Sequence, residues 1–456
     1  MKACRRDMLH TLAMTAAVMA LTLAGLAATG QFATWLTLDT PSYVAAAASA
    51  APLAQIRLPV YGWLLAIPGA IALLPAVQIG TYFAATLCLV AALRRAACSH
   101  ALALSVGIAL TVSNELLLWG RAAVPELPGH TLLLVACALV VELAAGRAAA
   151  GRAAGWRIAA AALAVTGAWA LRPSLLPFAV LLPVLLLCLP RRLPAGRAHR
   201  CAAALLALSL LPFLGLAGLR AVRVGDFNIV SFTGFQVAGV ATLMLTPDLV
   251  AALPPDQQPL AADILARRMV LERAGDIIPV PANSTGQRSF VSAAAGYFDI
   301  FARSYDAATW DAAGGTRRPD ETWPAFDHRL RGFALATFRA APIQYAAWVV
   351  GATARLAGHA VALNLPFLLG AAGLLAALAL RLPRGLPLPP PASEVDTRTL
   401  LALSAMQAVG AGLPVVLLTM PAQRYVESAA LFLAAWPIHA LIRLRSGAPT
   451  GRTPPP

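Results

Sequence analysis

Long apolar runs separated by short polar segments make up most of the chain, and this pattern predicts helices that span a membrane. The runs are rich in Leu, Ala and Val and are about 20 residues long, enough to cross roughly 30 Å of hydrocarbon. A backbone in lipid must form its hydrogen bonds internally, which favours helices, and the runs lack the alternation of an outer-membrane barrel. We therefore predict an all-α polytopic membrane protein with about ten spans, at approximately 11–30, 73–93, 100–119, 128–146, 156–171, 173–190, 201–219, 361–380, 400–420 and 426–443.

The first span has the basic start and apolar middle of a signal peptide, but its length and the many later spans favour a retained helix. A second apolar stretch, 58–74, is interrupted by prolines and by Gly69. We interpret it as a helix lying at the membrane interface rather than as a span.

One long segment, 220–342, has a different composition from the rest of the chain. It holds more than half of the acidic residues, many arginines and several large aromatic residues. A disordered linker would have fewer large apolar residues, so we expect a small folded domain. The segment 331–360 is typical of an amphipathic helix that returns the chain to the bilayer.

The predicted organisation follows from these segments. It is a membrane domain at 1–219, with spans one to seven and a first outer loop at 31–72, then the loop domain at 220–342, then the amphipathic helix and spans eight to ten at 343–446, and a disordered tail at 447–456. The proline-rich stretch 386–391 is also expected to be unstructured.

Basic residues collect in every second short loop, and this distribution predicts the orientation because Lys and Arg mark the cytoplasmic side. The basic loops contain Lys2, Arg5, Arg6, Arg94, Arg95, Arg147, Arg152, Arg157, Arg191, Arg192, Arg197, Arg200, Arg381, Arg384, Arg398, Arg443, Arg445 and Arg452. Both termini are therefore expected to be cytoplasmic, with the loop domain outside the cell (plasma) membrane, the inner membrane of a Gram-negative host.

Composition agrees with a membrane protein and excludes several function classes. Hydrophobic residues make up 59% of the chain and charged residues 12%, against about 25% charged in a soluble domain. The net charge of +15 comes from dispersed arginines rather than from a cluster, so nucleic acid is not an expected partner. Lys2 is the only lysine, which excludes a Walker A, Schiff-base or kinase lysine, and the histidines have no metal-ligand spacing.

Ionisable and aromatic residues recur at the outward ends of the predicted spans. They lie in the segments Asp39–Tyr43, Arg57–Tyr61, Arg121–Glu126, Arg172–Pro173 and Arg424–Tyr425. A charged side chain near the membrane core costs about 2.5–3.5 kcal/mol at a helix centre and less at its ends. Separate loops that bring such groups to one level indicate a shared polar cavity.

These motifs resemble those of the GT-C glycosyltransferases, polytopic enzymes that use a polyprenyl-phosphate sugar and that include protein mannosyltransferases and lipid A aminoarabinose transferases. The likeness lies in Asp39-x-x-x-Tyr43 after span one, Arg57-x-Pro59-x-Tyr61 before a short apolar helix, and the acid Glu126 that ends a later outward loop. It covers the spans and short loops but not the loop domain. Relatives often have paired acids in the first loop, whereas Thr40 follows Asp39 here, so a divalent cation is compatible with the resemblance but not required by the sequence.

The resemblance implies an enzyme that transfers a hexose or pentose from a polyprenyl-phosphate sugar to an extracytoplasmic glycan, lipid or protein acceptor. Asp39 would be the catalytic base that accepts the proton of the acceptor hydroxyl, and Glu126 would orient the acceptor or the sugar. Guanidinium groups would stabilise the leaving phosphate. The implied substrate-binding residues are Arg57, Tyr61, Arg121, Arg172, Arg424 and Tyr425.

Each candidate also has a structural interpretation. Asp39 could cap the helix that follows span one, Glu126 could form a local ion pair with Arg121, and Arg172 and Arg424 could be interfacial anchors. Tyr61 fits an interfacial aromatic. Two further acids near span ends, Glu115 and Glu142, are expected to be structural.

Other function classes stay open at this point. One is a flippase or transporter for a lipid-linked or small substrate, which would be expected to show internal repeats and broken helices near the bilayer centre. Another is an O-antigen polymerase or ligase, and a third is a non-enzymatic assembly factor. The absence of a repeat in the sequence, and the acid directly after span one, favour the transferase.

Overall fold

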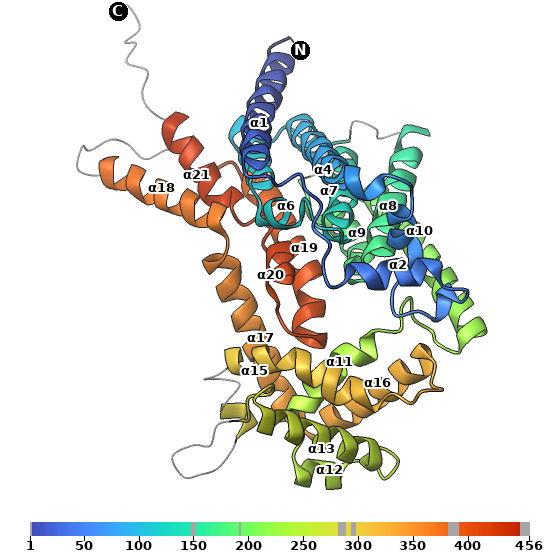
Figure 1. Ribbon diagram of the computed structural model, residues 1–456. Coiled ribbons are helices and arrows are strands. Elements are labelled where there is room, and N and C mark those ends of the chain that lie inside the picture. The colour runs from blue at the N-terminus through green and yellow to red at the C-terminus, as the bar shows by residue number, and fades with distance from the viewer. Residues whose placement is uncertain are drawn as a thin grey trace, which may run out of the picture.

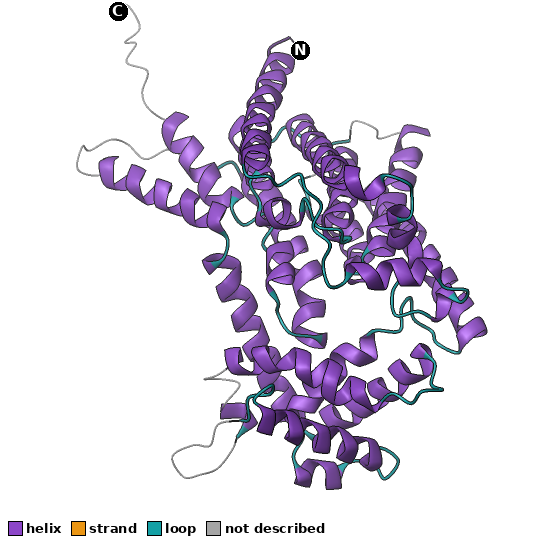
Figure 2. Ribbon diagram, in the orientation of Figure 1, coloured by secondary structure: helices purple, strands orange, loops and turns teal. Residues whose placement is uncertain are grey.

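The computed structural model describes residues 2–146, 152–190, 193–280, 289–292, 298–381 and 392–446 (Figure 1). This part of the chain is helical and contains no strand (Figure 2). Its β-type pairing is limited to an isolated parallel bridge between Trp35 and Ala122. The predictions for the proline-rich stretch 386–391 and for the tail at 447–456 lie outside the described residues.

Seven helices or helix pairs in the described part are long and apolar enough to cross a membrane. They are α1 (Lys2–Ala28), α4 (Ala70–Arg95), α5 (His100–Thr111) with α6 (Asn114–Trp119), α7 (Glu126–Ala144), α8 (Arg152–Leu171), α10 (Ala195–Val224) and α19 (Glu394–Leu418). An eighth span exists if α17 (Pro342–Ala362) and α18 (Leu365–Arg381), which meet at a bend of 61°, are one broken span. The all-α prediction is therefore confirmed, and the described residues contain seven to eight candidate spans rather than the ten predicted.

Two of the ten predicted spans are shorter than expected. The segment 173–190 becomes a 3-10 turn, η2 (Pro173–Leu175), followed by α9 (Phe178–Cys188), because the prolines at 173 and 177 delay the helix. The segment 426–443 is divided into α20 (Gln423–Ala429) and α21 (Ala435–Ser446). Pro437 has no N–H to donate, and it lies in the first turn of α21, where a missing N–H costs least.

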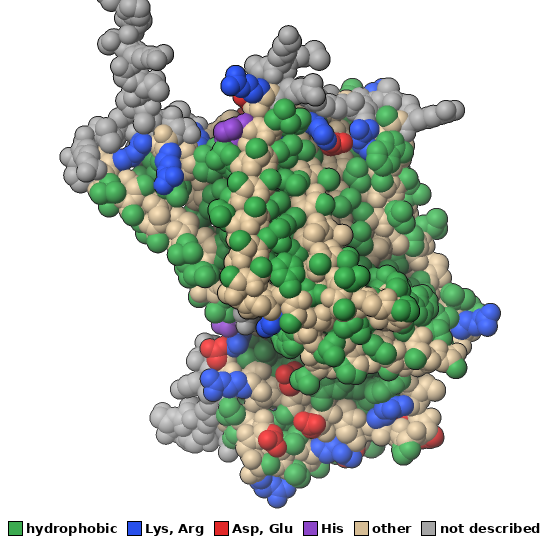
Figure 3. All heavy atoms as spheres, turned by 45° about the horizontal axis from the view of Figure 1, so that its top comes forward, with side chains coloured by type: hydrophobic (Ala, Val, Ile, Leu, Met, Phe, Trp, Pro, Cys, Tyr) green, Lys and Arg blue, Asp and Glu red, His purple; other side chains and the backbone are tan. Residues whose placement is uncertain are grey.

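Hydrophobic side chains cover the middle of the molecule in the space-filling view, while charged side chains gather toward its two ends (Figure 3). Inside, α7 packs against both α4 and α8 within a large buried apolar cluster. An apolar belt between polar ends is the surface that a bilayer solvates.

The segment 31–72, the predicted first outer loop, contains two short α-helices, α2 (Thr40–Ala48) and α3 (Pro59–Leu65), and the 3-10 turn η1 (Pro52–Ala54). The predicted interfacial helix at 58–74 is therefore limited to α3, since α4 already begins at Ala70. Gly69 separates them with a φ of 78°, a left-handed conformation that glycine adopts without strain.

The segment after α10 folds into helices with one apolar cluster of their own and a second that they share with α17 and α19. They are α11 (Thr233–Met244), α12 (Pro247–Ala252), α13 (Gln258–Ala274), α15 (Phe298–Ala307), the π-helix η3 (Ala308–Ala313), the short η4 (Gly314–Thr316) and α16 (Trp323–Ala340). This region lies at the end of the molecule opposite the start of α1 and the end of α21 (Figure 1).

Two helices in this region have bounds that differ from the predicted segments. The helix α10 continues to Val224, beyond the predicted span 201–219. The single helix predicted at 331–360 is α16 followed by α17. Pro342 forces the preceding Ala341 out of the helical region, to φ −131° and ψ 58°, and so divides the segment.

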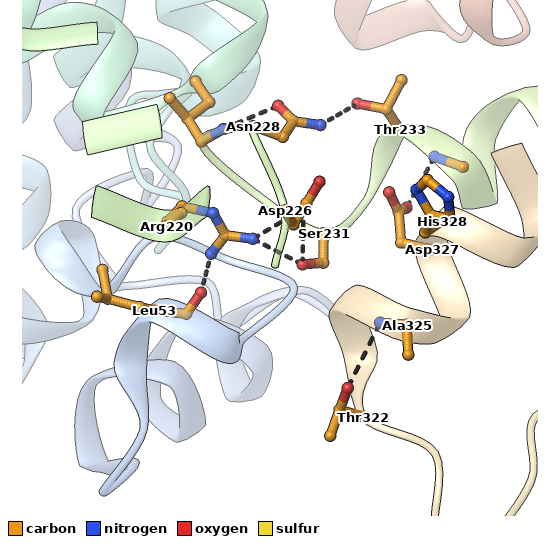
Figure 4. A network of polar contacts seen from close by, with 12 residues as sticks. Leu53, Arg220, Asp226, Asn228, Ser231, Thr233, Thr322, Ala325, Asp327 and His328 are labelled. Carbon is orange, nitrogen blue, oxygen red and sulfur yellow. Dashed lines mark hydrogen bonds and ion pairs between the residues drawn. The ribbon is translucent and has the colours of Figure 1, made fainter. Parts of the chain in front are cut away.

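A buried polar cluster joins the end of α10 to the first outer loop (Figure 4). The guanidinium of Arg220 donates to the backbone oxygen of Leu53, to Asp226 Oδ2 at 3.1 Å and to Ser231 Oγ at 2.8 Å. Asp226 also pairs with Arg331 of α16, 3.4 Å away. The cluster therefore connects α10, the first loop and the helices of 233–340.

A second carboxylate fixes α11 against α16. Asp327 Oδ1 accepts a hydrogen bond from the backbone N–H of Gly234 at 2.7 Å, at the start of α11. A Cβ at position 234 would lie 2.0 Å from the Asp327 backbone oxygen, so only glycine fits. Burial raises the pKa of Asp327 to about 6.

Candidate functional site

A cavity of about 380 Å³ lies where the first outer loop, the start of α7, the segment after α8, the segment 228–236 and the end of α19 meet. Five of the residues predicted from the sequence line it together. They are Asp39, Arg57, Glu126, Arg172 and Tyr425. They come from segments as much as 386 positions apart, since 425 − 39 = 386.

Asp39 and Arg57 form an ion pair at one side of the cavity. The distance from Arg57 Nη2 to Asp39 Oδ1 is 3.1 Å, and both side chains are partly exposed. The Arg57 guanidinium also lies over the rings of Tyr43 and Phe232, at 5.1 and 4.7 Å from their centroids. Asp39 precedes α2 but its side chain makes no capping hydrogen bond among the described residues. Its carboxylate is therefore positioned by Arg57 rather than by the helix that follows.

Glu126 and Arg172 form the second pair, in a more buried part of the wall. Arg172 follows α8, and its Nη2 lies 3.9 Å from Oε1 of Glu126, the first residue of α7. The Tyr425 ring covers the guanidinium, with 5.5 Å between Cζ and the ring centroid. Glu126 Oε2 is buried and has no hydrogen-bond partner among the described residues. A buried acceptor without a partner costs free energy, so this atom is suited to a ligand donor.

Three predicted site residues are placed differently. Tyr61 is buried and packs edge-on against Tyr43, so it lies behind the lining of the cavity. Arg121 is not among the described lining residues, and its backbone oxygen accepts from Trp35 N–H. The predicted local pair Arg121–Glu126 is replaced by Arg172–Glu126. Arg424 lies in the first turn of α20, next to Tyr425, but its side chain lies outside the described residues.

Residues that the sequence analysis did not assign to the site lie directly behind Arg172. The side chains of Glu115, His130 and Ser428 are buried there: Glu115 accepts a hydrogen bond from the Ser428 hydroxyl, and its Oε1 lies 2.9 Å from His130 Nδ1. The sequence interpretation of Glu115 was structural. An acid in an apolar run was the available signal, because charges inside membrane segments are costly and therefore mark functional positions.

The rest of the cavity wall is mostly apolar. Leu413, Val415, Leu417 and Leu418 of α19 line it, together with Ile229 and other apolar residues. A lining that combines charged and aliphatic side chains makes the cavity suitable for an amphiphile with a charged head and a hydrocarbon tail.

The formal charges of the described lining residues cancel, because Asp39 and Glu126 face Arg57 and Arg172. Among the described residues there is no group of three or more His, Cys, Asp or Glu side chains that could hold a metal ion.

Protein-family models, curated proteins and solved structures were compared with the chain, and none matches.

Proposed function

We propose that this chain is a membrane glycosyltransferase that moves a sugar from a polyprenyl phosphate to an acceptor outside the plasma (inner) membrane. The observation that carries the proposal is the meeting of Asp39, Arg57, Glu126, Arg172 and Tyr425 in one cavity with an apolar wall. The resemblance of their motifs to GT-C enzymes supports the same conclusion. A lipid-linked sugar has the matching chemistry: an isoprenoid chain, a phosphate and a hydroxyl-rich head.

The proposed reaction needs a base for the acceptor proton, a cation for the leaving phosphate and a site from which water is excluded. The acceptor hydroxyl attacks the anomeric carbon, its proton passes to Asp39, and the bond between the anomeric carbon and the phosphate oxygen breaks. The electron pair leaves with the polyprenyl phosphate, and the configuration at the sugar inverts. A positioned base typically contributes 10²–10⁴ in rate.

Arg57 and Arg172 have distinct proposed roles because their partners differ. Arg57 holds Asp39 at 3.1 Å and so orients the base. Arg172 is 3.9 Å from Glu126, a weaker contact, and it donates from Nη1 to Ser428, so its guanidinium is held in place and can still donate to a phosphate. Because the described charges of the wall cancel, a bound phosphate needs another cation, and Arg424 beside Tyr425 is our candidate.

The test uses the purified full chain in liposomes with a polyprenyl-phosphate sugar carrying a radiolabel, and with extracted envelope glycan, lipid and protein as acceptors. We expect label to pass into one acceptor class while polyprenyl phosphate is released. Movement of intact donor across the bilayer, without any chemical change, would instead show a flippase and overturn the proposal.

A further inference from the structure

Glu115 is a fully buried acid behind the cavity, and burying a carboxylate costs free energy. It lies in α6, within a candidate span, and its side chain has no exposed surface. An uncompensated carboxylate there would cost several kcal/mol, so its partners determine whether the position is tolerated. Two partners hold it: His130 Nδ1 at 2.9 Å from Oε1, and Ser428 Oγ at 3.1 Å from Oε2.

The direction of the hydrogen bonds in this cluster follows from the chemistry of its ends. A carboxylate only accepts and a guanidinium only donates. Ser428 has a single hydroxyl proton, which it gives to Glu115, so its lone pair is left to accept from Arg172 Nη1 at 3.4 Å. Glu115 thereby sets the orientation of the Ser428 hydroxyl, and this hydroxyl orients the guanidinium.

His130 fixes the other side of Glu115. Its Nδ1 donates a hydrogen bond to the backbone oxygen of Glu126 at 2.9 Å and also lies 2.9 Å from Glu115 Oε1, a close polar contact rather than a second hydrogen bond. Both neighbours are acceptors, so Nδ1 carries the hydrogen. The imidazole therefore links α6 to the first turn of α7, where the Glu126 side chain faces Arg172.

The backbone around Ser428 is held as well. Gln407 of α19 donates its side-chain N–H to the Ser428 backbone oxygen at 2.7 Å. The adjacent Glu427 accepts from Trp119 Nε1 at 2.9 Å. Ser428 is therefore a fixed point between α19 and α6, and none of Glu115, His130 and Ser428 is among the described lining residues.

We propose that Glu115, His130 and Ser428 are positioning residues that hold the Arg172 guanidinium toward the phosphate of the substrate. The inference rests on the proposed transferase function. The phosphate gains negative charge as the sugar leaves, so an arginine that is correctly aimed stabilises the transition state more than the bound donor. A variant that disturbs the orientation of the Arg172 guanidinium should therefore lower kcat more than it changes the donor KM.

Ser428→Ala is the first variant, because it removes one hydroxyl and leaves the charges in place. We expect kcat to fall roughly tenfold and the donor KM to change by no more than about twofold. Ser428→Thr keeps the hydroxyl and should restore most of the rate. Ser404→Ala is the matched control, since it removes a serine hydroxyl that binds Trp436 Nε1 in α21, and it should leave kcat unchanged.

A double-mutant cycle then separates positioning from a general structural role. In an Arg172→Lys background, Ser428→Ala should have almost no further effect on kcat, because the group that Ser428 orients is gone. An undiminished tenfold loss in that background, or a normal kcat in Ser428→Ala itself, would overturn the proposal.

Failure of the proposed function is recognised separately, as the absence of any sugar transfer by the wild type. In that case the same cycle is measured by thermal unfolding with and without polyprenyl phosphate. Coupling between Ser428 and Arg172 that changes when polyprenyl phosphate binds supports the positioning network, and coupling near zero rejects it.

Discussion

Replacing Asp39 with asparagine separates catalysis from structure at the proposed base. The variant keeps the size of the side chain and one oxygen that can accept from Arg57, but it removes the proton acceptor. The Asp39–Arg57 pair is partly exposed, at 29% and 18% of the side-chain surface. Pairs of this kind contribute about 0.2–1 kcal/mol, so folding should be lowered by no more than about 1 kcal/mol.

The expected catalytic effect is larger than this structural effect. Loss of a general base lowers the rate by about 10² or more, which corresponds to roughly 2.7 kcal/mol in the activation free energy. Donor binding should survive, because the variant removes a negative charge beside the phosphate and leaves Arg57 without its counter-charge. A reduced kcat with an unchanged or lower donor KM is therefore the expected pattern.

The assay is transfer of labelled sugar from a polyprenyl-phosphate donor in liposomes, normalised to the amount of folded protein. Glu142→Gln is the matched control, because Glu142 also pairs with arginines, Arg95 and Arg157, but lies at the other end of α7. Near-normal transfer by Asp39→Asn would refute the assignment and make Glu126 the next candidate for the base. Loss of folded protein would instead assign Asp39 a structural role.

Other predictions follow from the same structure. Arg172→Lys and Arg424→Lys should each reduce transfer at least about tenfold, because lysine keeps the charge but loses the planar fork, and full activity of both would reduce them to membrane anchors. Reporter fusions after Arg197 should be cytoplasmic and fusions within 248–327 external, and an external signal at Arg197 would contradict the orientation. The raised pKa of Asp327, about 6 against 3.8, means that the folded state binds the proton more tightly, so stability should increase by about 1 kcal/mol as the pH falls from 7 to 5. Thermal unfolding against pH should show this gain in the wild type and not in Asp327→Asn.

The sequence predicted the cavity better than it predicted the helices around it. Asp39, Arg57, Glu126, Arg172 and Tyr425 all follow or precede apolar runs on the same predicted side. The helix ends on one side of a membrane bundle lie at a similar depth in the bilayer. The predicted topology was therefore enough to indicate that these residues lie close together.

The residues behind the cavity could not be predicted in the same way. Glu115, His130 and Ser428 lie within predominantly apolar segments, where composition shows burial but not which neighbours a side chain meets. Their pairing depends on how α6, α7 and α20 pack. Tyr61 and Arg121 were misplaced for a related reason, because the path of a loop decides which side chains reach the cavity.

Local breaks in the helices were also underestimated. The segment 426–443 is apolar throughout, so a single helix was predicted where α20 and α21 are separate. Pro437 was the residue in the sequence that indicated a break. Pro342 similarly ends the helix that the amphipathic pattern predicted through 331–360. In both cases the hydrophobic pattern indicates which side chains avoid water, whereas proline restricts the backbone conformation. At these two positions the backbone restriction decides where the helix stops.

The central claim, that the cavity binds a lipid-linked phosphate, is tested most directly by photo-crosslinking with a polyprenyl phosphate that carries a photoreactive group on its isoprenoid chain. We predict crosslinks at the apolar wall, at Leu413, Leu417 and Leu418 of α19, that excess unlabelled polyprenyl phosphate abolishes. Leu375 of α18, which is 66% exposed, is the control for contact with bulk lipid. Crosslinks that appear at Leu375 but not at the α19 wall, and that polyprenyl phosphate does not compete, would contradict the claim.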